Sequence, residues 1–299
     1  MTVPQKSGTA RNGHDDLYFD AHGDSSDPPV LFVNGLGSQS INFLPAWVQR
    51  FCKGGFYVVR MDNRDVGLSS KTLGEPPKME RVVEQWAKSG SLGEFDAPYT
   101  LSDMAMDCLA VLDALEIKQA HIWGMSMGGM IAQTLAIEHP TRLQSMTTVM
   151  STTGEIGVGR STPEAASRLA PTGDDKASVV ANAVAARRLH GGALFDEQWA
   201  FSLEEAAYDR CHHPQGRTWQ VLAVMASGSR TAFLRSVEVP TTVIHGRMDP
   251  LIQLDGGEAT AELIPNAELV IYDQMGHDTP EPLWDDYVAD LQRLADRAK

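Results

Sequence analysis

The sequence predicts an α/β fold with a mostly parallel, doubly wound sheet, and three observations lead to this prediction. Strand-like apolar runs alternate with segments of helical spacing along most of the 299 residues. The runs are apolar throughout, as is typical of parallel strands covered on both faces. One stretch, residues 153–236, contains helical patches and no strand-like run. We therefore expect a helical insertion, 153–236, between two parts of one core, 1–152 and 237–299.

The individual elements follow from local patterns. Asn12-Gly13 is a hairpin turn signal, and polar and apolar residues alternate over 16–21, which indicates an antiparallel ribbon at the start of the chain. Further strands are expected at 30–33, 56–59, 121–123, 146–150, 241–245 and 269–272. Helices are expected at 41–52, 101–115, 127–138 and 283–295, and in the insertion at 177–189, 199–208 and 219–225. We expect Ser102 to cap the helix at 101–115.

Composition excludes several classes of function. With 25 basic and 39 acidic residues the net charge is −14, which disfavours nucleic acid as a partner. Cys52, Cys108 and Cys211 are far apart, so neither a disulfide framework nor a zinc ribbon is expected. The first ten residues are polar, and no run of about 18 apolar residues could span a bilayer. We expect a cytoplasmic protein without a membrane span.

The sharpest local signal is the pentapeptide Gly124-Met125-Ser126-Met127-Gly128, which lies between an expected strand and an expected helix. This is the context of a nucleophile elbow, in which the nucleophile occupies a tight turn between small neighbours. The start of the helix also directs free backbone N–H groups towards an oxyanion. Ser126 is therefore the candidate nucleophile.

A serine hydroxyl needs a base, usually a histidine that a carboxylate orients. His277 follows the expected strand at 269–272, and Asp249 follows the one at 241–245, so the order is that of a Ser-Asp-His triad in this architecture. Three other acids compete with Asp249 for the role: Glu155, Asp255 and Asp278. We prefer Asp249 because Gly246 and Pro250 bracket a tight turn at a strand's carboxyl end.

A tetrahedral oxyanion needs two positioned donors, here the amide after the nucleophile and one from the loop after an earlier strand. Met127 supplies the first. The second is expected in Asn34-Gly35-Leu36-Gly37, where glycines allow the chain to turn its amides inward, and we choose Leu36.

These residues together resemble the α/β-hydrolase superfamily over residues 16–295. Within it, residues 61–69, 124–133 and 239–250 are similar to actinobacterial esterases related to aclacinomycin methylesterase and to lipase/esterases of the LipG type. The resemblance implies an α/β-hydrolase fold, a serine-esterase mechanism without a cofactor, and a helical cap that shapes the acyl and alcohol pockets.

The chain departs from the family pattern at two places. It has Asn34-Gly35 where many relatives have His-Gly, and Asp65 replaces the first glycine of D-x-R-G-x-G-x-S. We expect Asp62, Arg64 and Asp65 to form a structural ion network near the site.

Cofactor and metal motifs are absent from the sequence. Residues 154–159 have the wrong glycine spacing for a dinucleotide site, no GxxxxGK[ST] loop occurs, and the adjacent Cys211, His212 and His213 do not have zinc-ligand spacing. We expect no cofactor and no metal.

The sequence therefore predicts a serine carboxylesterase for a small-molecule ester, with a homodimer as one possible assembly. Enol-lactone, thioester or C–C bond hydrolysis and cofactor-free haloperoxidase or perhydrolase activity would use the same triad. A non-catalytic ligand-sensing protein on the same fold is an alternative of another class.

Overall fold

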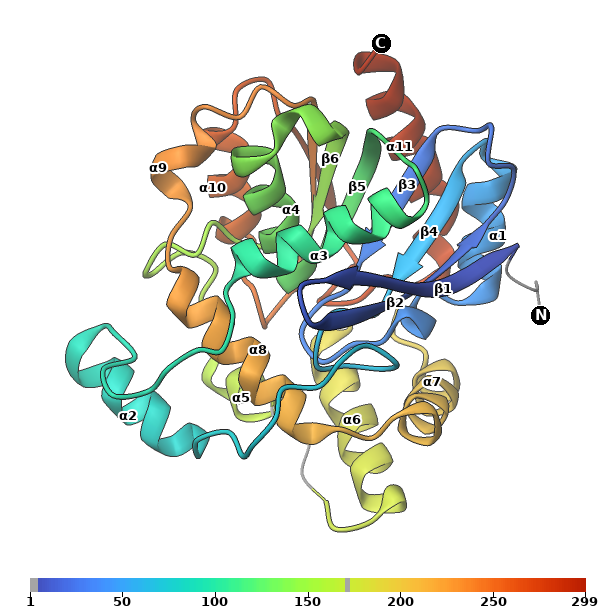
Figure 1. The fold of residues 1–299 in the computed structure, drawn as a ribbon. Helices are drawn as coiled ribbons and strands as arrows, with labels where there is room; N and C mark the ends of the chain where they lie inside the picture. Colours follow the sequence, from blue (N-terminus) through green and yellow to red (C-terminus); the bar gives the residue numbers. More distant parts are fainter. Residues whose placement is uncertain (1–4, 170–172) are drawn as a thin grey trace.

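The computed structural model describes residues 5–169 and 173–299, and an eight-stranded sheet runs through its centre (Figure 1). The strands lie in the order β1-β2-β4-β3-β5-β6-β7-β8. Their bounds are β1 Lys6–Asn12, β2 Asp15–His22, β3 Pro29–Val33, β4 Tyr57–Met61, β5 Ala120–Met125, β6 Leu143–Val149, β7 Thr241–Gly246 and β8 Glu268–Tyr272. The pairs β1-β2 and β2-β4 are antiparallel, and every pair from β4 to β8 is parallel. The mostly parallel, doubly wound sheet and the opening hairpin are confirmed.

Helices cover both faces of the sheet. Those that pack on the core are α1 Pro45–Lys53, α3 Leu101–Ala114, α4 Met127–Glu138, α10 Asp255–Leu263 and α11 Trp284–Arg297. Helices α1 and α11 pack on one face, and α3, α4 and α10 on the other. In the described ranges no helix is long and apolar enough to cross a membrane.

An aromatic cluster lies between the sheet and the helices α1 and α11. It includes Phe32, Phe43, Trp47, Trp123 and Tyr287, and neighbouring ring centroids are 4.9–6.3 Å apart. Fully burying a side chain such as Phe32 contributes about 1.5–3 kcal/mol. Phe32 belongs to β3 and Trp123 to β5, so this packing fixes the two strands whose carboxyl ends lead into Gly35 and Ser126.

Three local predictions differ from the structure. The helix α3 is capped by Thr100, not by Ser102, because the Thr100 side chain and Asp103 form a reciprocal capping box. The expected helix at 41–52 is divided into a short 3₁₀ turn, η1 Ser40–Asn42, and α1, which begins at Pro45. The prediction also lacks α2 (Met79–Ser89), which buries only Val82.

Between β6 and β7 the chain forms helices and no strand of the sheet in its described part. The helices are α5 Pro163–Ser167, α6 Lys176–His190, α7 Glu197–Arg210, α8 Pro214–Ser227 and α9 Thr231–Leu234. Figure 1 shows α5 to α8 gathered at one end of the sheet, away from the C-terminus. Val180, Val184 and Ala200 form a small apolar cluster between α6 and α7.

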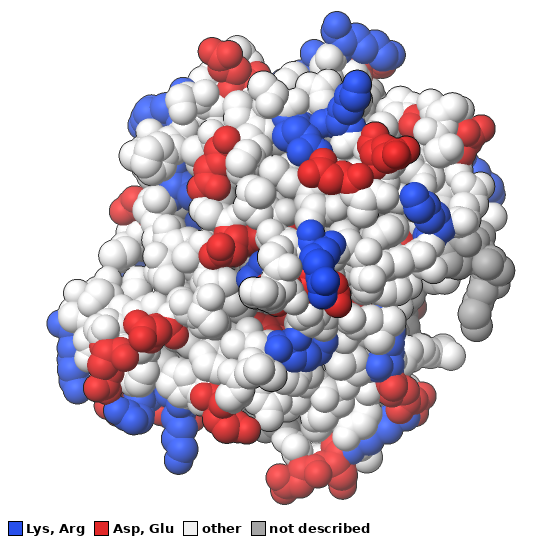
Figure 2. All heavy atoms as spheres, in the orientation of Figure 1, with Lys and Arg blue, Asp and Glu red and all other residues white. Residues whose placement is uncertain are grey.

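Acidic and basic side chains are interspersed over the face of the molecule that Figure 2 shows. Lys and Arg do not gather into a continuous basic stripe on this face, although a nucleic-acid backbone usually binds to such a stripe.

Candidate active site

Ser126 occupies a strained turn between β5 and α4. Its φ of 55° and ψ of −119° lie in a region that L-residues rarely adopt. The turn requires glycine on both sides: a Cβ on Gly124 would lie 2.1 Å from the carbonyl oxygen of Gly128, and a Cβ on Gly128 would lie 2.1 Å from that of Val33. The hydroxyl of Ser151 donates to the Ser126 carbonyl at 2.8 Å and helps to hold the turn.

The structure brings Ser126, His277 and Asp249 into one hydrogen-bonded chain. His277 Nε2 lies 3.0 Å from Ser126 Oγ, and His277 Nδ1 lies 2.7 Å from Asp249 Oδ2. A carboxylate only accepts hydrogen bonds, so Nδ1 carries the proton and Nε2 is free to accept from the serine hydroxyl. The other carboxylate oxygen, Asp249 Oδ1, accepts from the amides of Leu251 and Ile252 at 2.8 and 2.9 Å.

A contact from helix α6 places the backbone of His277. Its amide donates to the carbonyl oxygen of His190, at the end of α6, at 2.6 Å. A Cβ on Gly276 would lie 2.1 Å from that same oxygen, so the two segments touch. Burial lowers the pKa of His190. No local pattern in the sequence links His190 to His277, which is 87 positions away.

The three acids that compete with Asp249 for the triad role form their hydrogen bonds with other residues. Glu155 accepts from Ser229 at 2.8 Å, and Asp255 accepts from the amide of Gly159 at 3.2 Å. Asp278 accepts from the amide of Thr279 at 2.7 Å, and burial raises its pKa. None of the three bonds to His277 in the described structure.

The loop after β3 approaches the serine. A Cβ on Gly35 would lie 3.1 Å from Ser126 Cβ, and Leu36 and Met127 both line the cavity described below. Within residues 5–169 and 173–299 no hydrogen bond uses the amide of Leu36 or that of Met127. Both amides are therefore available to a ligand.

Helix α8 holds this loop through contacts that the sequence did not predict. The buried Gln220 accepts from the Gly37 amide at 2.8 Å and donates to the Arg64 carbonyl at 2.8 Å. Arg217, one turn earlier, donates to the Leu36 carbonyl at 3.4 Å. The partners are more than 150 residues apart in the chain, so no local pattern could have revealed these contacts.

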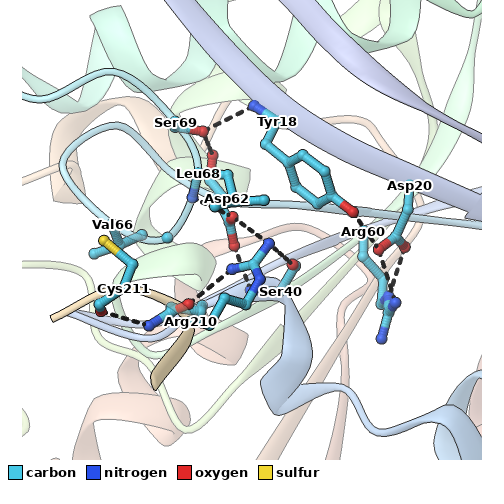
Figure 3. Close-up of polar contacts among 12 residues, drawn as sticks. Tyr18, Asp20, Ser40, Arg60, Asp62, Val66, Leu68, Ser69, Arg210 and Cys211 are labelled. Atoms are coloured by element: carbon cyan, nitrogen blue, oxygen red, sulfur yellow. Dashed lines mark hydrogen bonds and ion pairs between the residues drawn. The ribbon is translucent and has the colours of Figure 1, made fainter. Parts of the chain in front are cut away.

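Asp62 links the insertion to the core (Figure 3). It is fully buried and accepts from the amides of Ser40 at 2.6 Å and Leu68 at 2.8 Å, and Arg210 at the end of α7 lies 2.8 Å away. Arg210 also donates to Gln39 at 2.7 Å. This buried ion pair fixes the orientation of α7 over the loop.

The three residues expected in one ion network form no ion pair with one another in the described structure, although Tyr99 contacts both Arg64 and Asp65. Arg64 pairs with Asp107 at 2.6 Å, whereas Asp65 accepts from Thr72 and Tyr99. Asp65 has a φ of 71°, which explains why the family pattern has glycine at its position. Aspartate tolerates this left-handed conformation better than most residues.

The serine opens onto a cavity of about 520 Å³ that the loop after β3 and helices α6, α7 and α8 help to line. Apolar side chains form most of its wall, among them Met125, Met130, Met150, Val180, Val224 and Ile252. Arg187, Glu204, Arg217 and Asp278 also line it. In the described part of the chain no three His, Cys, Asp or Glu side chains are arranged to hold a metal ion.

The model of the α/β hydrolase fold family matches residues 28–189, more than half of the chain. The chain belongs to the α/β hydrolase fold family. Rhodomycin D methylesterase DauP from a Streptomyces strain is 27% identical over 89% of this chain and 92% of its own length. The 3-oxoadipate enol-lactonase 2 of Acinetobacter baylyi is 25% identical over 85% of this chain and 84% of its own.

Solved structures of α/β hydrolases agree in fold. A meta-cleavage product hydrolase from Pseudomonas fluorescens superposes with a TM-score of 0.75 at 18% identity and covers 99% of both chains. The resemblance drawn from the sequence motifs is confirmed at the level of the family, and relatives of the methylesterase type are among its matches.

Proposed function

We propose that the protein is a serine carboxylesterase that hydrolyses small or medium-sized carboxylic esters through an acyl-enzyme, with Ser126, His277 and Asp249 as its catalytic triad. The observation that carries the proposal is the hydrogen-bonded chain of these three residues at the wall of a mostly apolar cavity. The similarity to rhodomycin D methylesterases supports an ester as the substrate.

In the first half-reaction the Ser126 oxygen attacks the ester carbonyl and His277 Nε2 takes the hydroxyl proton. Asp249 stabilises the imidazolium that forms, and its two amide donors keep its carboxylate aimed at Nδ1. The imidazolium then gives its proton to the departing alcohol, which leaves the acyl group on Ser126.

The amides of Leu36 and Met127 form the oxyanion hole in this proposal. Both lack a partner among the described residues, and the Met127 amide also lies at the positive end of the α4 dipole. In the second half-reaction His277 takes a proton from water, the resulting hydroxide attacks the acyl carbon, and the acid is released as Ser126 regains its proton.

The direct test is hydrolysis of 4-nitrophenyl esters from acetate to long-chain acids. Ser126→Ala should lower kcat by about 10³-fold or more, because the step that it removes has no substitute. Ser202→Ala is the matched control, since Ser202 is exposed on α7 and bonds only to its own helix. Equal turnover by wild type and Ser126→Ala would contradict the proposal.

Enol-lactone hydrolysis is a second candidate, favoured by the relative named 3-oxoadipate enol-lactonase 2. Attack on a lactone carbonyl uses the same nucleophile, base and oxyanion donors. An enol-lactone in the assay therefore distinguishes the two substrate classes. Thioester, C–C bond and perhydrolysis reactions would also depend on Ser126, whereas a ligand-sensing protein would turn over no substrate.

The domain organisation, location and assembly of the chain are part of the proposal. We assign residues 153–236 as a cap over the core formed by 1–152 and 237–299, supported by the contacts of α6, α7 and α8 with the site. The three free thiols, Cys52, Cys108 and Cys211, support a cytoplasmic location. A homodimer stays a proposal that sedimentation would test.

A further inference from the structure

Three arginines between β6 and β7 line the cavity, Arg168, Arg187 and Arg217, and their surroundings differ. Arg168 is exposed to solvent. Arg187, on α6, forms an ion pair with Glu204 and donates to Asn42 Oδ1 at 3.1 Å. Its guanidinium also lies over the ring of Trp199, 5.5 Å from the centroid. The charge of Arg187 is therefore balanced within the protein.

Arg217, on α8, has no such partner. Its hydrogen bonds in the described structure go to two backbone carbonyls, those of Leu169 and Leu36. No Asp or Glu of the described ranges lies within ion-pair distance of it, and the remaining residues, 1–4 and 170–172, include neither type. Glu204 attracts Arg217 through space but is paired with Arg187.

A guanidinium has five N–H donors in a planar fork, and two carbonyls leave donors of Arg217 without a partner among the described residues. The side chain lines the cavity in which a substrate would lie. Burial lowers the pKa of Arg217, whose side chain is only partly exposed and has no paired anion among the described residues. Such a position is costly unless a ligand compensates it.

Arg217 lies close to residues that we assign to the reaction. Its contact with the Leu36 carbonyl places the guanidinium beside the loop whose Leu36 amide we assign to the oxyanion hole. The charge of Arg217 also acts on His190, whose carbonyl holds the His277 amide. An anion on Arg217 would therefore belong to the same molecule as the ester that Ser126 attacks.

We propose that Arg217 is a specificity-determining residue that binds a carboxylate of the substrate, so that the preferred substrates are esters carrying a second, ionised carboxyl group. This inference rests on the proposed function, because it takes the cavity as the substrate site. A carboxylate matches the planar fork of a guanidinium with two parallel hydrogen bonds. The apolar wall of the cavity receives the chain between the two groups.

Two substrate pairs test the proposal, each differing by a carboxylate in place of a methyl group. Mono-4-nitrophenyl glutarate is compared with 4-nitrophenyl pentanoate, which varies the acyl side. The 4-carboxyphenyl ester of butyric acid is compared with the 4-methylphenyl ester, which varies the alcohol side. Wild type should favour the carboxylate in one pair by about 10- to 100-fold in kcat/KM, the range expected for hydrogen bonds to a charged group.

Arg217→Gln should abolish that preference, so that the kcat/KM ratio of the charged to the neutral ester falls to about 1, even where the lost bond to the Leu36 carbonyl lowers the turnover of both esters. Arg235→Gln, which removes the same charge from an exposed side chain that does not line the cavity, should leave the preference intact. A wild-type enzyme without preference in both pairs would overturn the inference. So would an equal loss for charged and neutral esters in Arg217→Gln, which would indicate a purely structural role.

Calorimetry separates this inference from the proposed function. Monomethyl glutarate should bind to Ser126→Ala about 10-fold or more tightly than methyl pentanoate does, and Arg217→Gln in that background should remove the difference. If no ester is hydrolysed but this difference is found, the proposed function fails and the carboxylate site stands. Equal binding of the two esters contradicts the carboxylate site.

Discussion

Gln220 connects α8 to the loop that we assign to the oxyanion hole, and replacing it with methionine isolates that connection. Methionine has a similar shape but no hydrogen-bonding amide, so Gln220→Met leaves the Gly37 N–H and the Arg64 carbonyl without their partner. An unsatisfied buried polar group costs about 1–3 kcal/mol. Gly37 is only partly buried, so water recovers part of its loss, and we expect a destabilisation of about 2–3 kcal/mol.

The catalytic effect follows from the position of the loop. Removing a whole oxyanion donor typically lowers kcat by about 10²- to 10³-fold. Gln220→Met only releases the loop that carries the Leu36 amide, so we expect kcat to fall by about 10-fold with KM within about 2-fold. The drop should appear in kcat because the donor acts on the transition state more than on the bound ester.

The assay measures kcat and KM on one 4-nitrophenyl ester well below the melting temperature, together with the thermal unfolding of each variant. Gln198→Met is the matched control, because Gln198 is exposed on α7 and its side chain has no hydrogen bond in the described structure. A lower melting temperature with unchanged kcat would refute the reasoning, since Gln220 would then support only the fold.

Two further predictions concern titratable groups. Asp249→Asn should lower kcat by about 10³- to 10⁴-fold, because an amide facing His277 favours the wrong tautomer. Asp278→Asn should lower kcat by less than about 10-fold. Steady-state kinetics that reversed this order would assign the catalytic acid to Asp278. Burial lowers the pKa of His121 from its ordinary value of about 6.5 to about 4. As the pH falls through this interval, the imidazole is protonated in the unfolded chain but not in the folded protein. This difference removes up to about 3 kcal/mol from the free energy of unfolding. Denaturant unfolding measured from pH 7 to pH 4 should therefore show a smaller loss of unfolding free energy in His121→Asn than in wild type or in the exposed control His14→Asn. Parallel plots of unfolding free energy against pH for the three proteins would contradict this prediction.

The sequence was sufficient for features that depend on neighbouring residues. The elbow at Ser126 is readable because steric limits act within five residues, where a Cβ on Gly124 would strike Gly128. The parallel strands are readable because burial on both faces requires apolar residues at every position. His277 and Asp249 follow from chain order, since the carboxyl ends of parallel strands meet at one edge of the sheet.

Features that depend on contacts between distant segments could not be read in this way. The cap of α3 is a local exception, because Thr100 and Asp103 are three residues apart and their capping box lies within the sequence pattern, so the prediction of Ser102 was wrong for a local reason. The roles of Gln220 and Arg217 arise where α8 meets the loop after β3, and no pattern in the insertion encodes that meeting. Charge proximity in the sequence also misled, because Arg64 pairs with Asp107 and is connected to Asp65 through Tyr99 and not directly.

The central claim is that Ser126 is the nucleophile that His277 activates. Its most direct measurement is the reaction of the intact protein with a fluorophosphonate, followed by mass spectrometry of the modified peptide. The account predicts one adduct per chain, on Ser126, and labelling that slows by orders of magnitude in His277→Ala. An unlabelled protein, or an adduct on another residue, would contradict it.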